Sequence, residues 1–337
     1  MQTKNIKRYL WEIYNDRLGV TDLKPIVEQA CRDYLLGNVE HFTLNEYGFQ
    51  DVNVEVVTST GRYFIKFFSR DKTETMATSY VRLMEAVSKS KVSYPALHKG
   101  PQGYLHTITI HQIQIRLCVQ HYIDGKNLHK TGVEPTLNEL CAISKEAALL
   151  NSIDFVPDFF ELDTWATLKF SEMFPIKKEA LTKDELLLVE PILDDYSRIS
   201  VTSLPLCLVH GDIIRTNIMK DTNGKIWIID LGAANYQARA VELAVMAHDL
   251  FLDLSSVQKT KNLRKLMLDE YQKIIKLKPI EIEVLPTLIR VTHAMYFLSA
   301  AFMERILGQG NSEISFWLNQ SKQALKSIEI SRELDRY

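Results

Sequence analysis

The spacing of hydrophobic and polar residues changes along the chain. Apolar residues at helical spacing predict two amphipathic helices, over residues 4–17 and 22–36. From about residue 40 the pattern becomes that of strands. The segments VNVEVV and YFIKFF, joined by a short spacer that contains Gly61, predict a β-hairpin. The chain therefore starts with helices and continues into a sheet.

The next segment predicts one helix and two more strands. Residues 73–90 carry apolar side chains on one helical face, and strands are expected over Tyr104–Ile110 and Gln112–His121. Two strands, a helix and two strands in this order fit a small antiparallel sheet with one helix.

After residue 135 the pattern is mainly helical. Helices are expected over 137–153, 182–199, 241–253, 260–276, 280–307 and 311–333, with breaks at Pro279 and at Gly308–Gly310. We therefore expect an α+β fold with an N-terminal helical segment (1–39), a sheet lobe (40–123) and a larger, mainly helical lobe (124–337).

Composition narrows the class of protein. The chain has 337 residues and a formal net charge of −2, so we expect no nucleic-acid partner, since phosphate contacts need clustered Lys and Arg. No apolar run approaches the roughly 20 residues of a membrane span, and the N-terminus lacks the shape of a signal peptide. The four cysteines are scattered without a CxxC pair, which favours buried free thiols over a zinc site. We expect a cytoplasmic enzyme with no membrane partner.

Candidate chemistry concentrates in Leu208–Gly232, LVHGDIIRTNIMKDTNGKIWIIDLG. A loop carries Asp212 and Asn217, a Gly-bearing turn follows, and an apolar strand ends at Asp230. Two carboxylates and an amide at this spacing suit Mg²⁺, which prefers oxygen ligands, together with a hydroxyl nucleophile. This pattern points to phosphoryl transfer.

The stretch resembles the aminoglycoside phosphotransferase and choline kinase superfamily. The resemblance rests on HGD with an Asn five residues after the Asp, followed by a strand that ends IDLG. It implies a protein-kinase-like two-lobe fold, ATP and Mg²⁺ as cofactors, and a small-molecule hydroxyl acceptor. The run VELAVMAHDL resembles the family's helix that begins with an acidic residue followed by Leu-Ala. Glu242 stands where Asp is commoner, as in the hydroxylysine kinase branch, and would brace the catalytic loop. We expect the chain near the homoserine kinase or hydroxylysine kinase branches.

The resemblance implies a role for each matching residue of the motif. Asp212 would accept the proton of the acceptor hydroxyl, and Asn217 and Asp230 would bind Mg²⁺. His210 would hold the loop. Arg215 would steady phosphate charge, or it would be a surface residue.

The sheet lobe also carries matches. Lys66 corresponds to the strand lysine that contacts the α- and β-phosphates, and the stretch 45–53, with Gly48, corresponds to the loop that covers the nucleotide. The run CVQHYIDG resembles the hinge between lobes, where the His121 carbonyl and the Ile123 amide would meet the adenine edge.

The chain departs from the family pattern on the helix after the lysine strand. Alignment of this helix places Tyr80 where the family has the Glu that pairs with the strand lysine. Three explanations stay open: the pairing is absent, the helix is shifted, or another residue pairs with Lys66.

Acidic residues in the helical lobe suggest an acceptor that carries an amine. The candidates are Asp158, Glu161, Asp163, Asp249 and Asp253, and the aromatic candidates for lining the acceptor pocket are Trp165, Tyr236, His293 and Tyr296. The acidic residues could equally well lie on solvated helix faces, and the aromatic residues could equally well belong to the packed core.

Two alternatives use the same motif. A Ser/Thr protein kinase would share the residues, although an APE-type segment and a long activation loop after Asp230 are missing. A non-catalytic nucleotide-binding protein would fit the absence of the helix Glu. The sequence does not choose between ATP and GTP, and it leaves the acceptor and the oligomeric state open.

Overall fold

The computed structural model describes residues 14–45, 51–158 and 162–327. Its internal contacts divide the chain into two compact units. The first, which we call the sheet unit, comprises Met1–Gly125 with Pro157–Phe159. The second, the helical unit, comprises Lys126–Val156 with Phe160–Tyr337.

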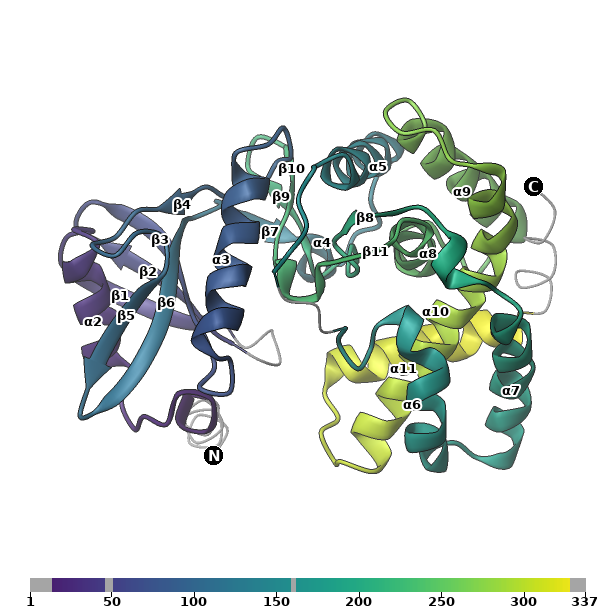
Figure 1. The fold of residues 1–337 in the computed structure, drawn as a ribbon, viewed down its shortest axis with the longest axis horizontal. Coiled ribbons are helices and arrows are strands. Elements are labelled where there is room, and N and C mark those ends of the chain that lie inside the picture. The colour runs from purple at the N-terminus through teal and green to yellow at the C-terminus, as the bar shows by residue number, and fades with distance from the viewer. Residues whose placement is uncertain (1–13, 46–50, 159–161, 328–337) are drawn as a thin grey trace. The chain divides into compact units, whose positions relative to one another are not determined.

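The sheet unit is built on an antiparallel sheet (Figure 1). Its strands follow the order β1-β2-β3-β6-β4, and β5 also pairs with β6. Their bounds are β1 Val39–Asn45, β2 Val52–Thr58, β3 Gly61–Phe67, β4 Leu97–His98, β5 His106–Ile110 and β6 Ile113–His121. The predicted hairpin is the pair β2 and β3, and the sequence analysis missed β1 and the two-residue strand β4.

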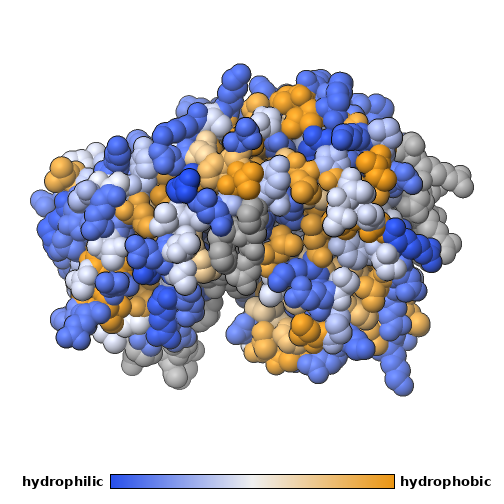
Figure 2. Space-filling model, in the orientation of Figure 1, coloured by the Kyte–Doolittle hydropathy of each residue, from blue (hydrophilic) through white to orange (hydrophobic). Residues whose placement is uncertain are grey.

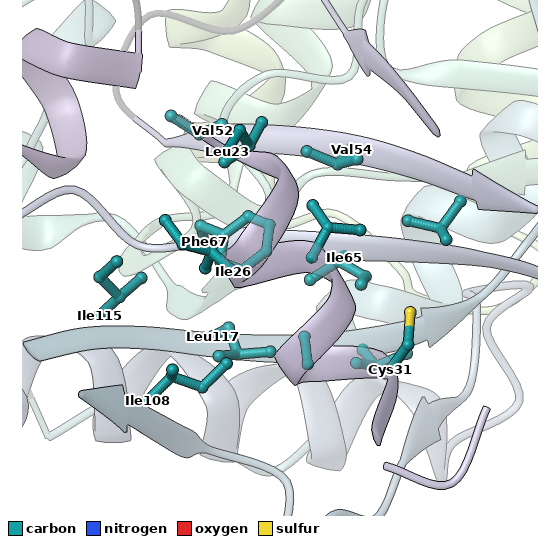
Figure 3. Close-up of a cluster of buried hydrophobic side chains, with 14 of the residues drawn as sticks. Leu23, Ile26, Cys31, Val52, Val54, Ile65, Phe67, Ile108, Ile115 and Leu117 are labelled. Atoms are coloured by element: carbon teal, nitrogen blue, oxygen red, sulfur yellow. The ribbon is translucent and has the colours of Figure 1, made fainter. Parts of the chain in front are cut away.

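Helices α2 (Lys24–Asp33) and α3 (Glu74–Ser88) pack on opposite faces of the sheet. Helix α2 shares a core cluster with Ile65 and Phe67 of β3. Figure 3 shows Leu23 and Ile26, at the start of this helix, together with these strand residues. Since side chains alternate along a strand, Lys66 points to the other face, which carries α3. The cores on both faces therefore fix the direction of the Lys66 side chain.

The first two predicted helices differ in their bounds from those observed. Of the helix expected over 4–17, the described part is helical from residue 14 to residue 18. The second ends at Asp33, because Leu35 takes a left-handed backbone conformation with φ of 56° and the chain turns into β1. The side chain of Leu35 is 88% exposed, so no packing favours continuation of the helix.

The helical unit contains most of the helices and two small sheets. Its helices are α4 Leu128–Thr131, α5 Leu137–Asn151, α6 Phe170–Lys177, α7 Lys183–Ser197, α8 Ala240–Asp249, α9 Val257–Tyr271, α10 Pro279–Arg305 and α11 Ser312–Lys326. One sheet has the order β10-β9-β7, and the other pairs β11 with β8. These strands are β7 Gly125–Asn127, β8 Leu206–Val209, β9 Ile218–Asp221, β10 Ile226–Ile228 and β11 Asn235–Ala238.

Helix α10 is the core helix of the helical unit. It packs against α6, α7, α8 and α11, and Pro279 starts it, where a missing backbone N–H costs nothing. By length and composition alone, α10 is the one helix among the described residues that could cross a membrane. However, 89% of its most apolar window is buried inside the protein, as expected of a core helix.

The surface carries both hydrophobic and hydrophilic residues. On the face drawn in Figure 2, hydrophobic residues are interspersed with hydrophilic ones. The most exposed large apolar side chains, Leu35, Val133 and Leu187, come from three different segments of the chain.

Candidate active site

The predicted catalytic loop connects β8 to β9, over residues 210–217. The loop turns at Gly211, which has a φ of +76°. A Cβ atom there would come within 3.0 Å of the carbonyl oxygen of Ala233, so both the backbone conformation and the close approach call for glycine. The turn directs the next residue, Asp212, toward the inside of the helical unit.

Two side chains hold the carboxylate of Asp212. The Tyr296 hydroxyl donates to Oδ1 over 2.8 Å, and Nδ2 of Asn217 donates to Oδ2 over 2.6 Å. Burial raises the pKa of Asp212 to about 7, against a smaller lowering by the hydrogen bond from Tyr296. The negative charges of Asp230 and of Asp163 raise it further.

The amide of Asn217 has a fixed orientation. Its Nδ2 donates to both the backbone oxygen and Oδ2 of Asp212, so its Oδ1 faces the opposite side. An amide oxygen is a suitable ligand for a hard cation such as Mg²⁺.

Asp230 follows β10 in a left-handed backbone conformation, with a φ of 59°. Its Oδ1 accepts a hydrogen bond from the Gly232 amide over 3.1 Å and caps a short 3₁₀ helix. The backbone amide of Ile229 donates to the Asn217 oxygen over 3.0 Å. The turn between β9 and β10 thus returns the chain to the catalytic loop, as predicted.

The donor set fits Mg²⁺ bound mainly through phosphate. Among the described residues, no group of three or more His, Cys, Asp or Glu side chains could hold a metal ion. Asn217 and Asp230 offer one amide and one carboxylate. Magnesium in phosphoryl-transfer enzymes is usually bound by one or two carboxylates with phosphate oxygens and water, so a larger protein cage is not required.

A buried carboxylate supports the backbone of the catalytic loop. Glu242, which is fully buried, accepts hydrogen bonds from the backbone amides of His210 and Gly211, over 2.6 and 3.3 Å, and from Asn151 Nδ2 over 3.1 Å. Tyr271 in turn donates to Oδ1 of Asn151 over 2.6 Å. Burial raises the pKa of Glu242 to about 7. These are the contacts of the structural support that the resemblance implies, and the sequence analysis missed Asn151 and Tyr271.

His210 also holds the loop. Its Nδ1 accepts from the Asp212 amide over 3.2 Å, which requires the neutral tautomer with the proton on Nε2, and Nε2 donates to the Ile229 oxygen over 3.0 Å. Burial lowers the pKa of the imidazole and keeps it neutral. The ring links the catalytic loop to the strand end that precedes Asp230.

Arg215 makes contacts of a structural kind. Its backbone amide and its Nε both donate to the fully buried carboxylate of Asp249, each over 2.7 Å. The guanidinium lies over the ring of Phe316 and is 3.6 Å from Glu134. It is thus more than a plain surface residue, because it binds a buried carboxylate.

Tyr296 belongs to an aromatic cluster in the core. Its ring packs at 4.3 Å from that of His248, at 5.4 Å from Trp317 and at 5.6 Å from Trp165, measured between centroids. The sequence analysis placed Tyr296 and Trp165 among the residues that could line a pocket and missed the bond to Asp212. The helical spacing of apolar residues predicts which face of α10 is buried. It does not indicate that Tyr296 bonds to Asp212, which is 84 residues away in the sequence.

The predicted acidic residues divide by their partners. Asp249 binds Arg215, Asp253 binds Lys259 over 2.6 Å, and Asp158, in the sheet unit, binds Arg82. Glu161 lies outside the described residues. Asp163 acts on the pKa of Asp212, and so does Glu313 at the start of α11, which the sequence analysis did not single out.

The residues predicted to bind the nucleotide lie in the sheet unit. Lys66 is buried on β3, and Nζ lies 3.5 Å from Oδ2 of Asp51. His121 ends β6 and its ring stacks on His98, and Ile123 follows outside any helix or strand. Gly48 lies outside the described residues. Of the three explanations for Tyr80, the structure favours the third: another residue, Asp51, pairs with Lys66.

Comparisons with known proteins bear on the fold and the family. The chain resembles the solved structures of a microcompartment-associated aminopropanol kinase (TM-score 0.68, 13% identity, 91% of this chain and 99% of that chain) and of an amicoumacin kinase in complex with AMP-PNP and Ca²⁺ (0.65, 12%, 91% and 94%). It also resembles a choline kinase from Streptococcus pneumoniae (0.62, 14%, 90% and 99%). At these identities the likeness shows the fold, which is the expected kinase-like one.

The sequence comparisons give the family. No curated protein sequence matches the chain. A family model described as "Phosphotransferase enzyme family" matches residues 41–269, which is more than half of the chain. The chain therefore belongs to the phosphotransferase enzyme family, and the phosphotransferase predicted from its HGD and IDLG motifs is confirmed.

Proposed function

We propose that this phosphotransferase moves the γ-phosphoryl group of ATP to a hydroxyl of a small, amine-bearing molecule. The observation that carries the proposal is the carboxylate of Asp212, which Tyr296 and Asn217 hold from two sides. Its pKa of about 7 suits a general base at neutral pH, because such a base works best when its pKa is near the operating pH.

Asp212 accepts the proton of the acceptor hydroxyl. The acceptor oxygen forms a new bond to the γ-phosphorus as the bond from that phosphorus to the β–γ bridging oxygen breaks, so ADP leaves and the proton stays on Asp212. Asn217 and Asp230 hold Mg²⁺, which supplies charge neutralisation at the phosphate oxygens. Lys66 binds the α- and β-phosphates. The amicoumacin kinase solved with AMP-PNP and Ca²⁺, and a spectinomycin phosphotransferase solved with ADP, support this choice of cofactors.

The charges around Asp212 support an acceptor with an amine. Asp230, Asp163 and Glu313 all act on its pKa, so the surroundings of the base are acidic. A cationic group on the acceptor would be attracted to carboxylates and would orient the hydroxyl toward Asp212. Aminopropanol and choline, named for two of the similar kinases, combine a hydroxyl with a cationic nitrogen.

The test is acceptor-stimulated ADP release. Purified protein with Mg·ATP is assayed against pairs of acceptors that differ only in the amine, such as an amino alcohol and the matching diol. We expect release with the amine-bearing member and its loss in Asp212→Asn. The matched control is Asp195→Asn, which removes a carboxylate bound to Arg290 in the same unit.

Three results would contradict the proposal. One is full turnover in Asp212→Asn, and another is equal stimulation by both members of every acceptor pair. The third is transfer of label from γ-labelled ATP to protein when the enzyme is incubated with a cell lysate. ATP and GTP are compared in the same assay.

A further inference from the structure

The lysine that the family pairs with a helix glutamate is paired differently in this chain. Asp51, 6% exposed, lies directly before β2, next to the end of β3. Its Oδ1 accepts a hydrogen bond from the Ser69 amide over 3.1 Å, which fixes the carboxylate. Its Oδ2 lies 3.5 Å from Nζ of Lys66. A carboxylate on the sheet therefore holds the strand lysine.

A second lysine contacts the same carboxylate. Nζ of Lys72, in the turn after β3, lies 3.0 Å from Oδ2 and 3.2 Å from Oδ1 of Asp51. Its side chain is only 12% exposed. Burying an ammonium group is costly unless it is paired, and Asp51 is a carboxylate partner of both lysines. The ammonium groups of Lys66 and Lys72 thus lie side by side and contact the same carboxylate, that of Asp51.

Tyr80 of α3 lies where a carboxylate would otherwise stand. Its ring centroid is 5.5 Å from Nζ of Lys66 and 5.1 Å from Nζ of Lys72, so one ring faces both cations. An aromatic face attracts a cation but adds no negative charge. The three ionised side chains, two ammonium groups and one carboxylate, thus sum to a charge of +1.

We propose that Asp51, Lys66 and Lys72 form one phosphate-binding group, in which Asp51 orients both lysines and Lys72 is a second cation for the nucleotide phosphates. The shared carboxylate allows each ammonium group to turn to a phosphate oxygen while the other stays on Asp51. A polyphosphate suits two adjacent ammonium groups, because each can contact a different phosphoryl group. The inference rests on the proposed use of a nucleotide.

The experiment measures binding of Mg·ADP and of adenosine to the full chain by calorimetry. The variants are Lys66→Met, Lys72→Met and Lys72→Arg. The control is Lys99→Met, which removes an exposed lysine that faces the ring of Tyr104 in the same unit. Thermal melting of each variant shows that it is folded, and Lys72→Arg keeps the charge and the pairing with Asp51.

We expect Lys72→Met to weaken Mg·ADP binding about 10-fold or more, since it removes a charge-assisted contact with phosphate. Adenosine binding should change less than 2-fold, and Lys72→Arg should recover most of the affinity for Mg·ADP. If Lys66→Met weakens Mg·ADP binding and Lys72→Met does not, the inference is wrong while the proposed function stands. If the wild-type protein binds no nucleotide, both fall. An equal loss of ADP and adenosine affinity in Lys72→Met would mark a structural lysine and overturn the inference.

Discussion

Replacing Tyr296 by Phe removes one hydroxyl and keeps the aromatic ring. The hydroxyl donates to Oδ1 of Asp212 over 2.8 Å. The ring packs between Trp165, His248 and Trp317, so a phenyl ring can keep the same position. The substitution therefore removes one hydrogen bond to the proposed base, Asp212, and leaves the packing of the ring at position 296 intact.

The size of the effect follows from that bond. A hydrogen bond to a charged group contributes about 1.5–3 kcal/mol, and one pKa unit corresponds to about 1.36 kcal/mol. The bond favours the ionised form, so its loss should raise the pKa of Asp212 by about 1–2 units from its value of about 7. At pH 7 the ionised fraction would fall from about one half to between a tenth and a hundredth, which predicts a kcat about 5- to 50-fold lower.

The assay is kcat as a function of pH between about 6 and 9.5, at saturating ATP and acceptor. In Tyr296→Phe the acid limb of the kcat profile should move to higher pH, and the profiles of variant and wild type should converge at high pH. The KM for ATP should stay within about 2-fold of the wild-type value. The control is Tyr196→Phe, which removes a hydroxyl that donates to the Leu168 oxygen over 3.1 Å, away from Asp212. An unchanged acid limb in Tyr296→Phe would refute the reasoning.

Three further predictions concern stability. The folded-state pKa of Asp212 lies above the ordinary value of 3.8, so its charge destabilises the fold above pH 7 and has no effect below about pH 4. Asp212→Asn should then gain about 2–4 kcal/mol in urea unfolding at pH 8 and nothing near pH 4, and equal gains at both would contradict this. Glu242→Gln replaces one of the two carboxylate oxygens, which together accept from three N–H donors, by an NH₂ group, and should lower the free energy of unfolding by about 1–3 kcal/mol. Arg215→Met leaves the Asp249 carboxylate without its guanidinium partner, and should cost about 3–5 kcal/mol, seen as a lower urea midpoint. The KM for ATP of the Arg215 variant should change less than 2-fold, and a large rise would support the predicted contact of Arg215 with phosphate.

The elements with strong periodicity were predictable, because local spacing decides them. The hairpin of β2 and β3 and the helix α3 follow from runs of apolar residues, and the catalytic loop follows from HGD and the Asn five residues later. The end of α2 was harder, because a left-handed residue at Leu35 has no local signal.

The partners of the site residues were not predictable. Asp51 and Lys66 are 15 residues apart, and their contact depends on the register of β2 and β3. Tyr80 could be recognised as a departure, but only the fold shows that a carboxylate on the sheet takes over the pairing. Tyr296 and Asp212 come together through the packing of α10, which the sequence defines only as an apolar helix.

The bond from Tyr296 attaches the proposed base to the middle of α10. This helix packs against α6, α7, α8 and α11, so the proposed base is attached to the core of the helical unit. Asp163 and Glu313 act on the base from a segment before α6 and from the first turn of α11. We therefore expect that exchanging those two side chains changes acceptor preference and the pKa of the base, while the bond from Tyr296 keeps the base in place.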